Sequence, residues 1–201
     1  NKIAKKFKIP VIEDAAQSFG SKHFKKRSCN LSSIACTSFF PTKSLGCYGD
    51  GGALFTNNKN IADRCKVIRS HGQKKKYNYQ ILGINGRLDT IQASFLLNKL
   101  TEFDTEIKKR VFKANYYLKN LNINNVNFLK TEKGNFNIYT LFNIKVKNRN
   151  KLIDYLKKKK IPTMIYYPKC VHLQKAFEKY NFGEGLFPVS EKSSLSIFSI
   201  P

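Results

Sequence analysis

The sequence has 201 residues, 41% hydrophobic and 13% aromatic, which is enough for one sizeable core or two small ones and argues against intrinsic disorder. Its 37 lysines and arginines against 13 acidic residues give a formal net charge of +24, a balance that suits a polyanionic partner such as nucleic acid. No known nucleic-acid motif accompanies the charge and no apolar run has the length of a membrane span, so we disfavour nucleic acid as a partner and expect no membrane.

The first elements predict a parallel sheet. Residues 9–12 (IPVI) form a short, wholly apolar run, typical of a strand buried on both faces of such a sheet. Glu13 and Asp14 follow at its carboxyl end, where open α/β sheets bind ligands. Residues 34–40 (IACTSFF) and 53–56 (ALFT) predict two further strands.

Two helices come next. Asn58 or Asn60 can cap a helix over about residues 61–70, which a basic turn and a glycine end. Asp89 and Gln92 resemble a capping box that opens a long helix through about residue 121. One apolar stripe is expected along it, formed by Ile91, Phe95, Leu96, Leu100, Phe103, Ile107 and Val111.

The last third predicts a small α+β unit. Residues 137–146 alternate as a half-buried strand, 151–160 form an amphipathic helix, and 162–167 (PTMIYY) predict another strand. We therefore divide the chain into a first part (1–100), a connecting helix (101–121) and a small domain (122–201) that we expect to be incomplete, because its last residues look like a strand cut short.

Lys43 lies where a lysine is least expected, between an apolar aromatic run and a glycine-rich turn in "CTSFFPTKSLGCYGDGGALFT". A nucleophilic lysine needs a rigid element that faces a pocket. The hydroxyls of Thr37 and Ser38 could hold a phosphate, and Asp14 could pair with a cationic ring nitrogen. Lysine, hydroxyl and carboxylate together indicate a pyridoxal phosphate site. We expect Tyr48 and Phe40 to belong to the core.

Longer motifs extend this interpretation over nearly the whole chain. "PVIEDAAQSFGS", "CTSFFPTKSLGCYGDGGALFTNN", "SHGQ", "NGRLDTIQASFLLNKL", "IPTMIYYPKCVHLQKAF" and "FPVSEKSSLSIFSIP" resemble the DegT/DnrJ/EryC1/StrS family of nucleotide-sugar aminotransferases. Within it, the sequence is most similar to enzymes that aminate a UDP-linked 3-keto-N-acetylglucosaminuronic acid for surface polysaccharide.

The resemblance implies an α/β fold of the aspartate aminotransferase type, in a homodimer with shared active sites. It makes residues 1–100 the carboxyl-terminal part of the large cofactor-binding domain. It makes Lys43 the Schiff-base lysine, Asp14 the partner of the pyridine nitrogen and Ser38 a phosphate ligand. Gln17 would contact the cofactor ring. Asn85 and Arg87 match positions that reach the neighbouring subunit's site, Asn85 towards the cofactor phosphate and Arg87 towards phosphate or substrate. Arg87 could instead pair with Asp89.

The implied reaction moves an amine from an amino acid, usually glutamate, to the keto-sugar. Tyr166 and Tyr167 would contact that sugar. The family commonly has His-Tyr-Pro where this chain has Tyr166-Tyr167-Pro168. Tyr166 would therefore replace the histidine as a donor, or simply pack.

Two other functions stay open: a non-catalytic basic protein that binds nucleic acid or anionic glycan, and an inactive truncated remnant. We expect a piece of a longer protein, because the family's Gly-Thr phosphate loop and stacking aromatic residue are missing from the sequence. Five cysteines without a CxxC pair and three dispersed histidines predict no metal and reduced thiols in a cytoplasm.

Overall fold

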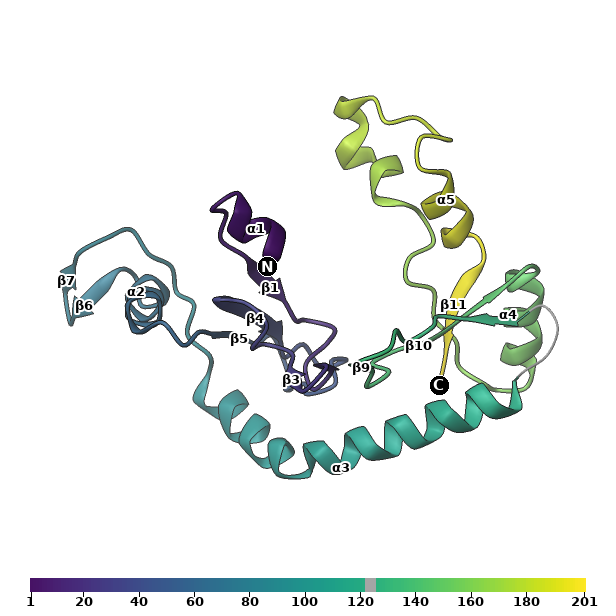
Figure 1. Ribbon diagram of the computed structural model, residues 1–201, viewed down its shortest axis with the longest axis horizontal. Helices are drawn as coiled ribbons and strands as arrows, with labels where there is room; N and C mark the ends of the chain where they lie inside the picture. The colour runs from purple at the N-terminus through teal and green to yellow at the C-terminus, as the bar shows by residue number, and fades with distance from the viewer. Residues whose placement is uncertain (122–125) are drawn as a thin grey trace. The chain divides into compact units, whose positions relative to one another are not determined.

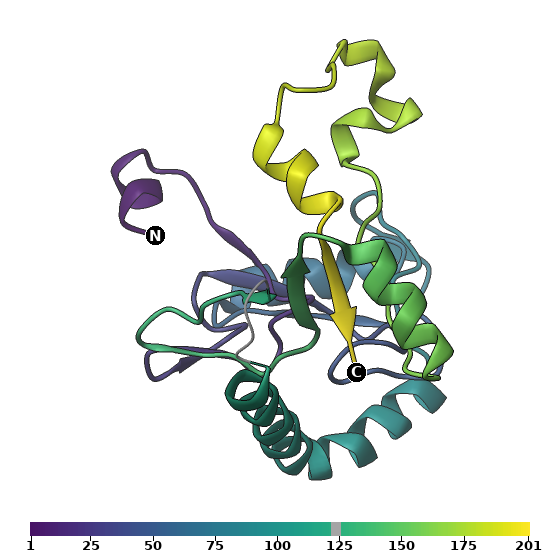
Figure 2. The same ribbon diagram turned by 90° about the vertical axis from the view of Figure 1, so that its right-hand side faces the viewer.

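The computed structural model describes residues 1–121 and 126–201, which form two compact units (Figures 1 and 2). The first unit comprises residues 1–111 and 131–140, and the second comprises residues 112–130 and 141–201. The boundary that we predict at residue 122 lies outside the described residues. The division of the sequence into three parts therefore stays a prediction.

The main sheet of the first unit has three strands in the order β1-β4-β5. They are β1 (Ile12–Asp14), β4 (Ile34–Ser38) and β5 (Gly52–Phe55). β1 runs parallel to β4, and β5 runs antiparallel to it. Ala35 and Thr37 of the central strand are buried. Both strands predicted around Lys43 are confirmed, within two residues of the predicted ends.

The prediction for the first strand is wrong in bounds and in burial. Pairing with β4 begins only at Ile12, because Pro10 has no N–H to donate and Lys8 has a positive φ of 54°. Ile9 and Ile12 are 61% and 66% exposed, so the strand is not buried on both faces.

Smaller elements complete the first unit. They are α1 (Lys2–Lys6), α2 (Lys59–Arg69), β2 (Lys22–His23), β3 (Lys26–Arg27), β6 (Gln73–Lys75), β7 (Asn78–Tyr79) and β9 (Asn135–Phe136). Strands β3, β2 and β9 form a second sheet, and β6 pairs with β7 in a hairpin beside α2 (Figure 1). Asn58, rather than Asn60, caps α2, since its side-chain oxygen accepts hydrogen bonds from the N–H groups of Asn60 and Ile61.

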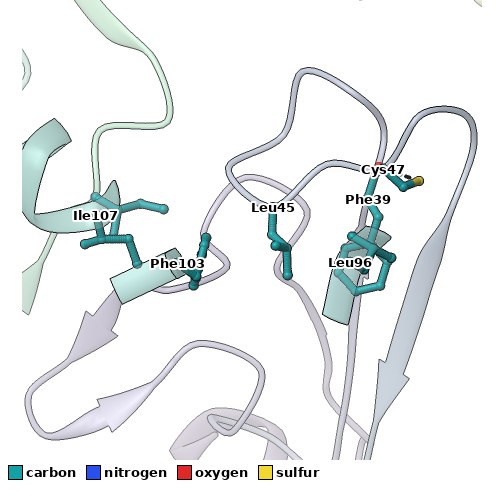
Figure 3. Close-up of a cluster of buried hydrophobic side chains, with 7 residues drawn as sticks. Phe39, Leu45, Cys47, Leu96, Phe103 and Ile107 are labelled. Atoms are coloured by element: carbon teal, nitrogen blue, oxygen red, sulfur yellow. Dashed lines mark hydrogen bonds between the residues drawn. The ribbon is translucent and has the colours of Figure 1, made fainter. Parts of the chain in front are cut away.

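Helix α3 (Thr90–Asn120) matches the predicted long helix closely. Figure 3 shows its residues Leu96, Phe103 and Ile107 in the buried core of the first unit. The predicted stripe is only partly buried, because Ile91, Phe95 and Leu100 are 71%, 43% and 48% exposed. The remaining core members from the first unit are Phe39, Leu45, Cys47 and Ile138.

The predicted capping box at the start of α3 is wrong for its glutamine. The side-chain oxygen of Gln92 accepts a hydrogen bond from the backbone N–H of Tyr48, 2.8 Å away, rather than reaching back along its own helix. A partner 44 positions distant in the sequence competes successfully with the local one. The glutamine therefore joins the helix to the segment that follows Lys43.

The second unit is built on an antiparallel sheet in the order β11-β10-β8. Its elements are β8 (Val126–Phe128), β10 (Phe142–Val146), α4 (Arg149–Lys158), the 3₁₀ helices Val171–Leu173 and Lys175–Tyr180, α5 (Pro188–Ser194) and β11 (Ile197–Ile200). Figure 2 shows α4 beside this sheet. The predicted helix at 151–160 is confirmed.

Two strand predictions in this unit need correction. The strand predicted over residues 137–146 begins only at Phe142, because Tyr139 has a positive φ of 51° and donates its N–H to the side chain of Asn137. The strand predicted over 162–167 is wrong. Met164 alone forms an isolated bridge, with Ser199 of β11, so a single residue of that segment pairs with the sheet.

Candidate functional site

Two polar residues meet at one edge of the main sheet, where the parallel strands β1 and β4 end. Asp14 is paired in register with Cys36, and Ser38 follows two residues later on β4. The carboxyl ends of parallel strands are the edge at which open α/β sheets bind ligands. The sheet therefore brings the predicted carboxylate and the predicted hydroxyl to the same edge.

Of the two acidic residues at the end of β1, Asp14 is the one available to a ligand. The Glu13 carboxylate accepts hydrogen bonds from the backbone N–H groups of Cys29 and Leu31, at 2.8 and 3.0 Å. Asp14 is exposed, and one of its oxygens accepts from the N–H of Ala16 at 3.0 Å.

Partial burial raises the pKa of the Cys29 thiol, and the Glu13 charge raises it further.

The two hydroxyls at the end of β4 differ in the same way. Thr37 is buried and donates its hydroxyl hydrogen to the carbonyl of Ala15 at 3.1 Å, so the prediction that it could hold a phosphate is wrong. The Ser38 hydroxyl accepts a hydrogen bond from the N–H of Phe40 at 3.2 Å. Since a hydroxyl can accept and donate at once, the Ser38 hydrogen is left to bind an anion.

Lys43 lies in a closed loop over residues 39–51, which we call the Lys43 loop. Its two ends are joined by a 2.8 Å hydrogen bond from the Phe39 N–H to the Gly51 carbonyl. The buried Cys47 donates its N–H and its thiol to the Phe39 carbonyl (Figure 3). The Lys43 N–H donates to the Phe40 carbonyl at 2.8 Å. Backbone bonds thus fix the lysine on a loop whose base belongs to the core.

Gly46 is required where the loop touches itself. A Cβ at this position would lie 2.6 and 2.8 Å from the carbonyl oxygens of Pro41 and Phe40. Because those atoms belong to the main chain, they cannot turn aside as a flexible side chain can.

The expectation that Phe40 and Tyr48 belong to the core is wrong, since they are 47% and 72% exposed.

The other first-unit candidates lie on segments beside these elements. Gln17 is exposed just after β1, and its carbonyl accepts from the Thr140 hydroxyl at 3.0 Å. Asn85 is exposed and forms an isolated bridge with Ser70 at the end of α2. Arg87 is exposed as well, and in the described part of the chain it forms no ion pair with Asp89.

Tyr166 and Tyr167 belong to the second unit. They are 42% and 70% exposed and line a cavity of about 430 Å³. Lys169, Gln174 and the serines of α5 line the same cavity, together with the apolar residues Pro168, Val171 and Ile197. Such a lining can donate hydrogen bonds to a polyhydroxylated or anionic ligand.

The groups at the sheet edge and on the Lys43 loop fit pyridoxal phosphate chemically. A carboxylate with an unused oxygen can hold a protonated ring nitrogen, a hydroxyl with an unused hydrogen can bind phosphate, and a primary amine can bond to an aldehyde. Among the described residues no hydrogen-bond or ion-pair partner of the Lys43 ammonium group is found. Residues 1–121 and 126–201 contain no group of three or more metal-ligating side chains.

The whole chain, residues 1–201, matches the model of the DegT/DnrJ/EryC1/StrS aminotransferase family. The chain belongs to this family. It is 43% identical over 201 residues to the UDP-2-acetamido-2-deoxy-3-oxo-D-glucuronate aminotransferase of Pseudomonas aeruginosa. The match covers 100% of this chain and 55% of that relative. The chain therefore spans about half the length of the curated relatives that it matches.

Solved structures of several aminotransferases resemble the chain over its full length. The S. venezuelae DesV structure, in complex with a ketimine intermediate, has a TM-score of 0.95 at 32% identity, and the chain covers 54% of it. NtdA from Bacillus subtilis, with bound cofactor PMP, has a TM-score of 0.85 at 28% identity, with 47% of it covered. The fold class is that of the aspartate aminotransferase type, of which this chain represents a part.

Sequence reasoning missed two residues of α3 that contact the Lys43 loop. Gln92 binds Tyr48, and Lys99 donates from its ammonium group to the Gly46 carbonyl at 2.6 Å. The two lie seven residues apart, which places them on one face of a helix. That spacing was the available signal, but it does not reveal a partner in a distant loop.

None of the described helices is long and apolar enough to cross a membrane.

Proposed function

We propose that the protein carrying this sequence is a pyridoxal-phosphate-dependent aminotransferase that acts on a nucleotide-linked keto-sugar. One observation carries the proposal: Asp14, Ser38 and the Lys43 loop lie at the carboxyl ends of adjacent strands in a chain of this aminotransferase family. The likeness to NtdA, whose structure holds PMP, supports the choice of cofactor.

Each of the three residues has a separate task. Pyridoxal phosphate, when bound, supplies an aldehyde that carries amino groups and a ring that accepts electrons. Asp14 would hold the proton on the ring nitrogen with its unused carboxylate oxygen. Lys43 would form the covalent link to the protein and then move a proton at the reacting carbon. Ser38 would donate its hydroxyl hydrogen to the phosphate.

Three further residues would complete the cofactor and phosphate contacts. Gln17, exposed directly after β1, would lie against the ring. Asn85 and Arg87, both exposed, would serve the site of a second copy, Asn85 at the cofactor phosphate and Arg87 at phosphate or substrate. This assignment requires a homodimer in which each site uses both subunits.

The substrate that we propose is the UDP-linked 3-keto derivative of N-acetylglucosaminuronic acid. The support is the 43% identity to the P. aeruginosa aminotransferase, whose name states the corresponding 3-oxo-glucuronate. Tyr166 and Tyr167, from the cavity of the second unit, would contact the sugar. Glutamate would be the amine donor. The enzyme would act in the cytoplasm, and its product would be a precursor of surface polysaccharide, including lipopolysaccharide.

The covalent link is the first test of the proposal. The natural full-length polypeptide would be mixed with pyridoxal phosphate, reduced with borohydride, digested and mapped by mass spectrometry. We expect the cofactor to be fixed on Lys43 and the Lys43→Ala variant to remain unlabelled there. Lys109→Ala is the matched control, because Lys109 is an exposed lysine of α3.

The outcome separates the proposal from its competitors. Folded wild type that traps no cofactor on Lys43 would overturn it and favour a basic binding protein or an inactive remnant. In that case, polyanion binding that weakens steeply with salt would identify the binding protein. If Lys43 is labelled, conversion of the UDP-keto-sugar with glutamate, followed by chromatography, tests the proposed substrate.

A further inference from the structure

We propose that Gln92 and Lys99 of helix α3 are positioning residues that hold the Lys43 loop in place. The inference rests on the proposed function, which gives Lys43 the task that needs a fixed position. The two side chains form hydrogen bonds to the main chain of the loop, and Leu45 and Cys47 of the loop pack in the core. Neither is assigned a contact with cofactor or substrate.

Lys99 holds the loop through a single main-chain atom. Its ammonium group donates to the Gly46 carbonyl at 2.6 Å, and its side chain is half-buried. Hydrogen bonds from a charged donor are short and about twice as strong as neutral ones. Gly46 itself lies against the carbonyl groups of Phe40 and Pro41, which are three and two residues before Lys43. A shift of Gly46 would therefore displace the Phe40 carbonyl, which accepts the hydrogen bond from the Lys43 N–H.

Gln92 holds the loop two residues further along. Its side-chain oxygen accepts from the Tyr48 N–H at 2.8 Å. The Tyr48 ring lies edge-on to Phe95, with 4.7 Å between the ring centres, and the Lys99 ammonium lies 5.8 Å from the centre of the same ring. Tyr48 is thus bound by its N–H and by its ring although it is 72% exposed.

Gln92, Phe95 and Lys99 together form a contact surface on one face of α3, which we call the clamp. Gln92, Phe95 and Lys99 recur at intervals of three and four, so they line one face of α3. Leu96, between them, is buried against the core that contains Leu45 and Cys47 of the loop (Figure 3). Catalytic groups must be held within about half an ångström of their productive position. The clamp supplies that restraint outside the reacting groups.

The test measures the loop without any cofactor. Amide hydrogen exchange of the natural full-length polypeptide would be followed by mass spectrometry in peptides that cover residues 44–50. Lys99→Met and Gln92→Leu should each speed that exchange on the order of tenfold, because each removes one hydrogen bond to the loop. Gln92→Glu keeps an acceptor for the Tyr48 N–H and should exchange like wild type. Lys109→Met is the matched control on the same helix.

A second readout reports on the lysine itself. Acylation of Lys43 by an amine-reactive ester should accelerate in Lys99→Met and Gln92→Leu, while Lys109 in the same digest keeps its rate. Folded variants with wild-type exchange and acylation overturn the clamp, and so does Gln92→Glu behaving like Gln92→Leu. If Lys99→Met does not fold, the Gln92 pair decides. Since no cofactor is added, failure to trap pyridoxal phosphate would overturn the proposed function and leave this result standing.

Discussion

Replacing Gly46 by alanine would press a methyl group against the main chain of the Lys43 loop. The new carbon would lie 2.6 Å from the Pro41 carbonyl oxygen, 2.9 Å from its carbonyl carbon and 2.8 Å from the Phe40 oxygen. A carbon at ordinary contact distance needs about 3.5 Å, so the loop must open by more than half an ångström. The Phe40 carbonyl also accepts the N–H of Lys43, and the displacement therefore reaches the lysine.

The expected cost follows from that geometry. Overpacking of a well-packed region destabilises by about 1–3 kcal/mol, a change of roughly 5- to 150-fold in the unfolding equilibrium. Urea denaturation followed by circular dichroism measures it. Gly183→Ala is the control, because nothing lies within 4 Å of a Cβ there. Equal midpoints for Gly46→Ala and Gly183→Ala, with unchanged labelling of Lys43, would refute the reasoning.

Glu191→Gln should lower the urea midpoint at pH 7, because hydrogen bonds, chiefly from the Gly185 N–H, hold the Glu191 pKa below its ordinary value. The effect should begin to shrink below the ordinary carboxyl pKa of about 4.3 and vanish once the pH has fallen through the lowered pKa of the folded protein; a loss that stays constant as the pH falls contradicts this. The midpoint pH for iodoacetamide alkylation of Cys29 should be higher in the folded protein than in urea, since burial and then Glu13 raise its pKa, and identical profiles would count against it. Asn58→Ala should cost about 1 kcal/mol of stability and speed amide exchange at the start of α2, and unchanged exchange there would disprove the cap.

Local signals were sufficient for the helices of the first unit. Asn58 caps α2 by accepting from N–H groups two and three residues away, so the sequence could limit the cap to Asn58 or Asn60. Asp89 and the apolar periodicity together indicated a long helix whose ends agree with Thr90 and Asn120, although Gln92 does not act in a cap. The fold class itself came from the resemblance to a family, because periodicity cannot specify which strands pair.

Some of the wrong predictions depend on distant partners. Gln92 can satisfy a local cap or a remote N–H, and only the folded chain shows that Tyr48 takes it. Thr37 looks like a phosphate ligand until β1 brings the Ala15 carbonyl within 3.1 Å. Met164 has strand-like neighbours, yet it alone bridges to β11. The candidate roles of the site residues remain predictions that the experiments above test.

The buried thiol of Cys47 gives the Lys43 loop a reporter of its own. It is 3% exposed, and its single hydrogen lies within reach of the carbonyls of Phe39 and Gly49, so a reagent can reach the sulfur only after the loop leaves the core. The rate at which Cys47 is alkylated would therefore report on loop opening in the native protein, without an introduced label. When opening and closing are faster than the chemistry, the rate measures the population of the open state.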